Sequence, residues 1–297
     1  MLHAIYRVIP FKKNLFDLIK LVYKPSKSVY QHLHFHGDIK VKVGKSNAFK
    51  IRHYGYQIEN DLYWAGYGNG FESTSLNLWA LLSKDCKTVF DIGANTGIYA
   101  LAASAMNPDA KVYAFEPIHR IADKLAHNVE MNGYDIEVVV AGASYESKQT
   151  EIYETATEHA YSASLSPDML VGVDNVISSK IDVIRVDDFV NTQAITKIDL
   201  VKVDAEKFEA EVLEGFGDLI KRDKPAFLME VLNEQLGQDV SKFFVDMGYT
   251  FFRIEDGIGV FPTETLGTKP LNYLICTSDV IERFGFEGSR LHADLLP

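Results

Sequence analysis

The chain has few cysteines and no long apolar run. Among its 297 residues only Cys86 and Cys276 are cysteines, and they lie far apart. They cannot form the framework of bridges that holds small secreted domains together, and we expect them to be small apolar core residues. No stretch approaches the roughly 18 uninterrupted apolar residues of a membrane-spanning helix. The N-terminal segment also lacks the small-residue cleavage site of a secretory signal, so a cytoplasmic protein is expected.

Basic residues are in deficit over the whole chain but are concentrated at its N-terminus. The formal net charge is −11, whereas residues 1–50 hold ten lysines or arginines and only two acids, Asp17 and Asp38. Domains that bind DNA or RNA usually carry a basic footprint over the binding cleft. The acidic remainder of the chain therefore argues against nucleic acid as a partner.

The N-terminal segment combines this positive charge with a helical pattern. Apolar residues recur between Leu2 and Tyr23 with basic residues between them, and Pro10 interrupts the pattern. Two interpretations remain open: a helix docked on the domain, or a basic helix in peripheral contact with an anionic membrane. We expect residues 1–70 to form an extension of this helix and a β-meander, and residues 71–297 to form the main domain.

Short alternating runs between residues 31 and 58 are typical of such a meander. His32, His34 and His36 would lie on one face of a strand there. Three imidazoles on one face could bind a metal ion, or they could simply form an exposed strand face. No carboxylate or cysteine stands at ligand spacing beside them, so no metal site is assigned.

A strand, a glycine turn and a helix follow one another from Thr88 to Met106. Strand-forming residues precede the turn, Gly93 and Gly97 allow the backbone to bend, and the alanine-rich segment after them favours a helix. The N-terminus of a helix offers N–H groups and partial positive charge to an anionic group. This order predicts the binding of a nucleotide-like cofactor.

An acid ends the second strand of the same unit. Residues 111–115 predict a strand, and Glu116 follows it 19 residues after Gly97. An acid at this distance can accept hydrogen bonds from both hydroxyls of a ribose. Asp91, which ends the first strand, can meet an ammonium group. Taken singly, Asp91 could also be only a helix cap and Glu116 only a solvated acid.

The turn lacks the third glycine of the G-x-G-x-x-G dinucleotide fingerprint. Its pattern is D-x-G-A-N-x-G, formed by Asp91, Gly93, Ala94, Asn95 and Gly97. The pattern resembles motif I of the class I S-adenosylmethionine-dependent methyltransferases. This resemblance implies S-adenosylmethionine as the cofactor, with its ammonium, carboxylate and ribose met by the acids and the helix N-terminus.

Further motifs extend the resemblance. They are Phe-Glu-Pro at 115–117, Asn128 and Asn132 in the following helix, residues 197–215 with the pattern K-x-D-x-E…E-x-x-V-L-x-G, and residues 225–231. Together they make the chain similar to the FkbM family of methyltransferases over about residues 71–276. The resemblance implies a Rossmann-like fold, S-adenosylmethionine as methyl donor, and usually O-methylation of a sugar or other hydroxyl. It also places Asn128 near the cofactor and both Ala141 and Ser144 along the adenine.

Strand and helix patterns alternate from residue 88 onward, which predicts a parallel sheet with helices on both faces. Strands are expected near 88–92, 111–115, 136–140, 198–203, 225–230, 249–254 and 271–276, and helices near 97–106, 118–132, 206–216 and 235–246. The predicted fold is a doubly wound α/β architecture with a mostly parallel seven-stranded sheet, whose last two strands pair antiparallel. Residues 143–190 break the alternation and predict an inserted hairpin and a serine-rich cover loop near the active site.

Three acids follow the fourth and fifth core strands. Ligands of parallel sheets bind at the carboxyl ends of the strands, so Asp204, Glu206 and Glu230 should converge near the transferred methyl group. Asp204 is the first candidate for a base or an acceptor-orienting group, and Glu230 is the second. Asp204 could also cap the following helix, and the three acids could together bind a divalent cation. The FkbM family commonly has glycine where this chain has Lys207, which puts the acceptor pocket or the helix start in doubt.

The function expected from these residues and this resemblance is S-adenosylmethionine-dependent O-methylation of a sugar or glycan hydroxyl. A nicotinamide-dependent Rossmann oxidoreductase is one alternative, and the missing third glycine counts against it. A non-catalytic scaffold that still binds the cofactor is another. The acceptor would be a small molecule or a glycan, and the sequence fixes neither its identity nor the oligomeric state.

Overall fold

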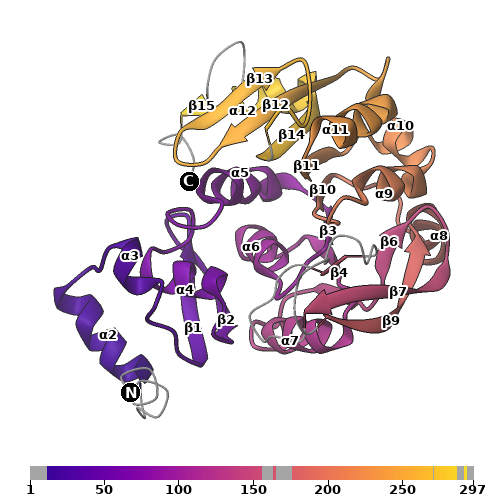
Figure 1. Cartoon of the computed structure of the whole chain (residues 1–297). Helices are drawn as coiled ribbons and strands as arrows, with labels where there is room; N and C mark the ends of the chain where they lie inside the picture. The colour runs from indigo at the N-terminus through magenta and orange to yellow at the C-terminus, as the bar shows by residue number, and fades with distance from the viewer. Residues whose placement is uncertain (1–11, 156–162, 165–175, 270, 286–290, 293–297) are drawn as a thin grey trace.

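The computed structural model describes residues 12–155, 163–164, 176–269, 271–285 and 291–292 (Figure 1). In the first half of the chain the elements are α2 (Lys12–Val22), α3 (Lys27–Tyr30), β1 (Gly37–Val43), β2 (Asn47–His53), α4 (Gln57–Trp64), α5 (Ser73–Leu82), η1 (Ser83–Asp85), β3 (Thr88–Ile92), α6 (Ile98–Met106), β4 (Lys111–Phe115), α7 (His119–Glu130) and β5 (Ile136–Val139). The remaining elements are β6 (Gly142–Ser144), β7 (Lys148–Thr155), β8 (Ala163–Ser164), β9 (Val176–Arg185), α8 (Val186–Thr192), β10 (Leu200–Val203), α9 (Glu209–Phe216), α10 (Leu219–Asp223), β11 (Ala226–Val231), α11 (Glu234–Ser241), η3 (Lys242–Phe244), β12 (Tyr249–Glu255), β13 (Gly259–Thr263), β14 (Leu271–Thr277), α12 (Ser278–Phe284) and β15 (Leu291–His292).

The largest sheet has the strand order β15-β13-β12-β14-β11-β10-β3-β4-β5. The five strands from β11 to β5 run parallel, whereas β14 pairs antiparallel with both β11 and β12. The expected α/β class, the mostly parallel core and the antiparallel final pair are therefore confirmed. The sheet exceeds the predicted seven strands because residues 259–263 turn back onto β12 and themselves pair with β15.

Side chains of the sheet alternate between two apolar layers, as the geometry of a strand requires. Val89 belongs to the layer that α5 and α6 cover, whereas its neighbour Phe90 belongs to the layer covered by α8, α9 and α11. Figure 1 shows the two groups of helices on opposite sides of the central strands. Helices on both faces explain why the core strands read as almost continuous apolar runs.

The N-terminal segment forms one hairpin instead of the predicted meander. Strands β1 and β2 pair antiparallel from Gly37 with His53 to Val43 with Asn47. Their buried side chains share the apolar layer of α5 and α6, so the hairpin packs directly on the main sheet domain. The chain then enters α4, where the Glu59 carboxylate accepts a hydrogen bond from the N–H of Tyr56 at 3.1 Å. Whether residues 1–70 behave as a separate unit stays a prediction.

The sequence also predicted a strand carrying three histidines and an N-terminal helix in this segment. The strand expected at His32 to His36 is wrong, because these histidines precede β1 and share no strand face. Helix α2 is present and rests on the protein through Phe16, which is buried. The break expected at Pro10 lies outside the described residues. None of the helices in the described ranges is both long and apolar enough to cross a bilayer.

The inserted hairpin is confirmed. Strands β7 and β9 pair antiparallel over eight residue pairs, from Lys148 with Val183 to Thr155 with Val176. Strand β6 pairs parallel with β9 and so joins this small sheet to the end of the main one. Of the serine-rich loop, only residues 163–164 belong to the part of the chain that the structure describes, as β8 beside β7.

Candidate active site

The turn after β3 requires glycine for two separate reasons. Gly93 has a φ of 80° and Gly97 a φ of 93°, both in the left-handed region that favours glycine. A Cβ at Gly93 would lie 1.9 Å from the carbonyl oxygen of Asp204 at the end of β10. A Cβ at Gly97 would meet Leu125 of α7 at 2.4 Å. The two predicted glycines thus let the turn fit between its neighbours.

Asp91 is buried under this turn and caps the helix that follows. Its Oδ2 accepts a hydrogen bond from the N–H of Ala100 at 2.8 Å. Burial raises the pKa of Asp91 to about 7, against the opposing charge of Lys202. The capping role is therefore present in the structure, and a contact with the cofactor ammonium stays a prediction.

Glu116 ties the glycine turn to the end of β4. Its Oε2 accepts a hydrogen bond from the N–H of Asn95 at 3.1 Å, and its Oε1 accepts one from the N–H of Ile118 at 2.9 Å. The side chain is nearly buried, with a relative exposure of 5%. It does not point into bulk solvent, as a merely solvated acid would, and a role in binding ribose stays a prediction.

A cavity of about 450 Å³ lies at the carboxyl ends of β3, β10 and β11. Its lining includes six of the predicted residues: Gly93, Ala94, Asn95, Asp204, Glu206 and Glu230. Ile152, Ile181 and Val183 from β7 and β9 line it as well, so the inserted hairpin does cover the site. Six other predicted residues are not part of its lining: Asp91, Gly97, Glu116, Asn128, Ala141 and Ser144.

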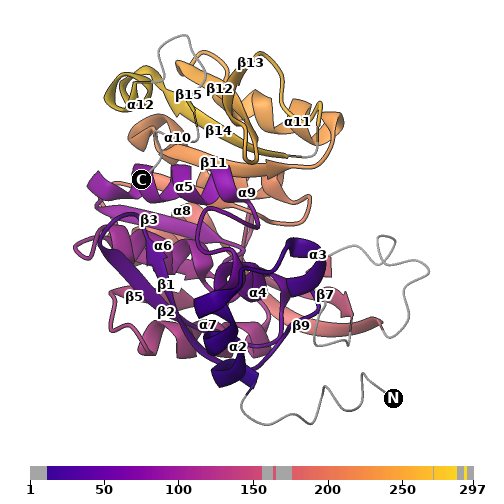
Figure 2. The same ribbon diagram turned by 90° about the vertical axis from the view of Figure 1, so that its left-hand side faces the viewer.

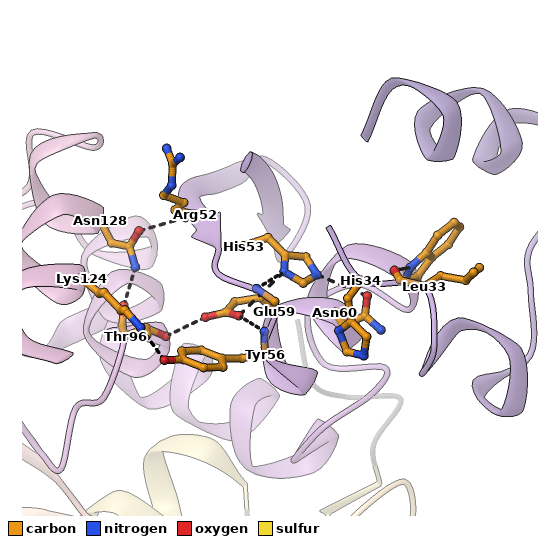
Figure 3. Close-up of polar contacts among 12 residues, drawn as sticks. Leu33, His34, Arg52, His53, Tyr56, Glu59, Asn60, Thr96, Lys124 and Asn128 are labelled. Atoms are coloured by element: carbon orange, nitrogen blue, oxygen red, sulfur yellow. Dashed lines mark hydrogen bonds and ion pairs between the residues drawn. The ribbon is translucent and has the colours of Figure 1, made fainter. Parts of the chain in front are cut away.

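Asn128 is one of these residues, and its side chain holds the glycine turn from behind. Its Nδ2 donates a hydrogen bond to the carbonyl of Thr96 at 2.8 Å, and its Oδ1 accepts one from the N–H of Arg52 at 2.9 Å (Figure 3). The amide is completely buried. It therefore joins strand β2 to the cofactor turn, and direct contact with the cofactor stays a prediction.

Glu59 of α4 approaches the same turn from the N-terminal segment (Figure 3). Its Oε1 lies 3.4 Å from the hydroxyl of Thr96, and burial raises its pKa to about 8. His53 is 4.0 Å away but does not form an ion pair with it. The Nδ1 of His53 accepts a hydrogen bond from the N–H of Gly55, and burial lowers the pKa of this histidine to about 3. The imidazole is therefore neutral.

A buried lysine that sequence reasoning missed organises the acids of the cavity. Lys202 in β10 is 1% exposed, and its Nζ lies 3.3 Å from Asp204 Oδ2 and 3.3 Å from Asn272 Oδ1. Burial alone would lower the pKa of Lys202, but the carboxylates around it, Asp204 first, outweigh burial and raise it. The sequence did contain an indication of this role, because a lysine inside an apolar strand pattern would be a buried charge and buried charges need partners.

Two further acids face this lysine. Burial, and then the charge of Asp204, raise the pKa of Glu230 to about 8. Glu72, also missed, precedes α5 with a φ of 41° and accepts a hydrogen bond from the hydroxyl of Tyr99. Burial raises the pKa of Glu72 as well. Burial and the neighbouring carboxylates thus make Glu230 and Glu72 hold protons more tightly than isolated acids do, against the opposing charge of Lys202.

The helix expected from residue 206 begins three residues later, at Glu209. Glu206 and Lys207 instead have φ values of 50° and 80°, and Glu209 Oε1 accepts hydrogen bonds from the N–H groups of Ala205 and Lys207. Asp204 therefore does not start the helix. Lys207 keeps the backbone conformation that glycine favours, and its exposed side chain stands outside the cavity lining. The departure from the family pattern thus leaves the cavity wall unchanged.

Within the described residues, no group of three or more histidine, cysteine, aspartate or glutamate side chains is placed to hold a metal ion. This covers Asp204, Glu206 and Glu230 as well as the three histidines ahead of β1.

Residues 91–251 match the family described as the methyltransferase FkbM domain, which covers more than half of the chain. The chain belongs to the FkbM methyltransferase family. Its similarity to the 31-O-demethyl-FK506 methyltransferase FkbM of Streptomyces tacrolimicus is 29% identity over 154 residues, covering 44% of this chain and 59% of that protein. Its similarity to the AMB antimetabolite synthetase AmbE of Pseudomonas aeruginosa is 26% identity over 180 residues, covering 50% of this chain and 8% of that protein.

The chain thus spans less than two thirds of these curated relatives. A crystal structure of methyltransferase FkbM from Methylobacillus flagellatus is similar with a TM-score of 0.41 and 16% identity, over 64% of this chain and 44% of that one. The predicted resemblance to the FkbM family is confirmed by the family match. S-adenosylmethionine, the cofactor that the resemblance implied, is confirmed with it.

The cavity of this FkbM protein suits that cofactor. Gly93 and Asn95 line it, and Glu116 at the end of β4 accepts a hydrogen bond from the N–H of Asn95. The apolar side chains of Ile118 and Ile121 also line the cavity, which suits a flat adenine ring. Glu116 would hold the ribose, and the first turn of α6 would face the carboxylate.

Proposed function

We propose that this FkbM protein catalyses O-methylation of a sugar or glycan hydroxyl. The observation that carries the proposal is the arrangement of Asp204 and Glu230 around Lys202, in the same cavity as the glycine turn. A hydroxyl is a poor nucleophile, so its methylation needs a group that removes its proton. The name of the Streptomyces relative, which describes methylation at an oxygen of its own substrate, supports an oxygen acceptor.

The two acids have different environments and so different roles. Asp204 is held by the Lys202 ammonium at 3.3 Å, and this fixed position suits it to orienting the acceptor hydroxyl. Glu230, whose pKa is raised to about 8, acts as the base and takes the hydroxyl proton. S-adenosylmethionine, when bound, supplies a methyl group already activated by the positive charge on sulfur. The isoleucines of the inserted hairpin help to exclude water from the cavity.

An acceptor screen tests the proposal. The purified protein is incubated with radiolabelled S-adenosylmethionine and a panel of sugars, glycans and glycolipids, and label transfer to oxygen is measured. Glu230→Gln and Asp204→Asn should each lower turnover by about 100-fold or more while cofactor affinity is retained. Glu214→Gln on the exposed side of α9 is the matched control and should leave turnover unchanged.

Two outcomes would contradict the proposal. Transfer of label only to nitrogen, carbon or sulfur acceptors would place the chemistry elsewhere. Cofactor binding without transfer to any acceptor of the panel would favour the non-catalytic scaffold instead.

A further inference from the structure

Helix α2 is held on the protein by one face only. Phe16 is buried, and its ring centroid lies 5.3 Å from that of Trp64 and 5.9 Å from that of Phe35. The hydroxyl of Tyr63 donates a hydrogen bond to Asp17 at 2.7 Å. Both Trp64 and Tyr63 belong to α4, so the docking of α2 is a specific contact between two helices.

The opposite face of α2 is apolar and exposed. The relative exposures are 48% for Leu15, 64% for Leu18, 80% for Leu21 and 88% for Val22, and Tyr23 follows with 57%. The residues at 15, 18 and 22 follow helical spacing and so share one stripe. Single exposed leucines are ordinary, but four aliphatic side chains along one helix face mark a surface that contacts something apolar. Figures 1 and 2 place α2 at the end of the molecule farthest from β13.

Positive charge gathers at the same end of the molecule, mainly on the other side of α2 from this stripe. Residues 12–36 contain five lysines and a single acid, Asp17, which pairs with Lys13 at 2.8 Å. A groove of about 700 Å³ runs between α2, β1 and α4. Its lining includes five lysines: Lys13, Lys20, Lys24, Lys40 and Lys42. The body of the protein is acidic, so this end carries a local charge opposite to that of the whole chain.

We infer that α2 binds an anionic lipid bilayer through its exposed stripe, aided by the lysines gathered at the same end of the molecule. A helix with an aliphatic face and a lysine-rich opposite face is the kind that lies in a membrane interface, with its apolar side chains among the acyl chains and its long lysine side chains reaching towards the phosphates. A second copy of the chain is a poorer occupant, because stacking two such ends would bring their lysines together.

Helix α4 connects this surface to the cavity. Its first residues, Gln57 and Ile58, line the cavity, and its last residues, Tyr63 and Trp64, hold α2. A helix of eight residues is about 12 Å long. A protein seated on a bilayer through α2 would thus hold its cavity close to the lipid headgroups.

Vesicle flotation of the full chain tests the inference. Vesicles of phosphatidylcholine alone are compared with vesicles containing about 30 mol % phosphatidylserine, because lysines respond to anionic lipid. We expect binding to the anionic vesicles only, and loss of this binding at high salt. The double variant Leu18→Asp/Leu21→Asp should weaken it by about tenfold or more. Val245→Asp, at a valine that is 61% exposed elsewhere on the surface, should bind like the wild type.

Several outcomes would overturn the inference. The wild type would fail to float with anionic vesicles, or the double variant would float equally well. Binding that appears only after deletion of residues 1–11 would mean that the chain covers its own stripe. Concentration-dependent dimerisation that the double variant abolishes, without vesicle binding, would identify a second copy as the occupant. Circular dichroism of every variant verifies that the fold is retained.

Discussion

Glu230 is the side chain whose ionisation should control turnover. Its pKa is raised to about 8 by burial and by Asp204, and a base works only in its deprotonated form. We predict that kcat/KM for methyl transfer rises about tenfold per pH unit below this pKa and levels off above it. Glu230→Gln should remove the dependence along with most of the activity. A wild-type profile that is flat from about pH 6 to about pH 9 would contradict the assignment of Glu230 as base.

Glu116 should contribute its charge to cofactor affinity. Glu116→Gln keeps one acceptor oxygen but loses the charge-assisted hydrogen bonds to the ribose, so we predict about tenfold weaker binding of S-adenosylmethionine. Isothermal titration calorimetry measures it, with Glu214→Gln as the exposed control. Because Glu116 also holds Asn95, the unfolding midpoint is measured in parallel. Unchanged affinity would rule out the ribose-binding role.

At the residue scale, position relative to the predicted strands was enough to identify some site residues but not others. The glycine turn, Glu116 and the cavity acids were predicted because each stands at the end of a predicted strand. Glu72 precedes the first core strand, and only the packing of α5 brings its carboxyl beside Lys202. A lysine within the apolar strand β10 indicates that Lys202 is a buried charge, but its partner Asn272 lies 70 residues away in β14. Contacts between residues so distant in sequence are not encoded in any local pattern.

The turn between β10 and α9 contains a non-glycine residue in the left-handed region. Lys207 has a φ of 80°, and a non-glycine residue there loses about 1 kcal/mol. We predict that Lys207→Gly stabilises the protein by about 0.5–1 kcal/mol in urea unfolding. Lys221→Gly in α10, an exposed lysine with ordinary helical geometry, is the matched control and should destabilise by about 1 kcal/mol. Equal effects of the two changes would contradict the strain.

At the element scale, periodicity predicted what depends on burial. The buried parallel strands and the helices between them could be predicted, because helices on both faces of the sheet keep those strands apolar. The prediction of an N-terminal meander was wrong because residues 31–58 form only two strands, β1 and β2, which pair with each other. The predicted start of α9 was wrong because the Glu209 carboxylate accepts hydrogen bonds from N–H groups of the preceding turn. These bonds stabilise a non-helical backbone there. Such side chain–backbone bonds override propensity at element ends.

For the whole molecule, buried carboxyl groups set how stability depends on pH. The folded-state pKa is raised to about 8 for Glu59 and to about 7 for Asp91, above the ordinary value near 4. The folded state therefore binds more protons than the unfolded state, and stability is lost as pH rises through these values. His53, with its lowered pKa, acts only below about pH 6.5, where it is neutral in the fold but protonated when unfolded.

We predict that the urea midpoint falls between about pH 6.5 and about pH 8.5. Glu59→Gln should make this fall shallower, because glutamine cannot ionise. A midpoint that rises over the same interval would show that the buried acids are ionised at no cost in the folded protein.

The measurement that tests most directly where the cofactor lies is a crystal structure of the protein with S-adenosylhomocysteine. The expected result places the ligand in the cavity at the ends of β3, β10 and β11. Its ribose should contact Glu116, and its sulfur should face Asp204 and Glu230. A ligand bound elsewhere on the molecule, or one whose sulfur points away from both acids, would contradict the proposed site and its chemistry.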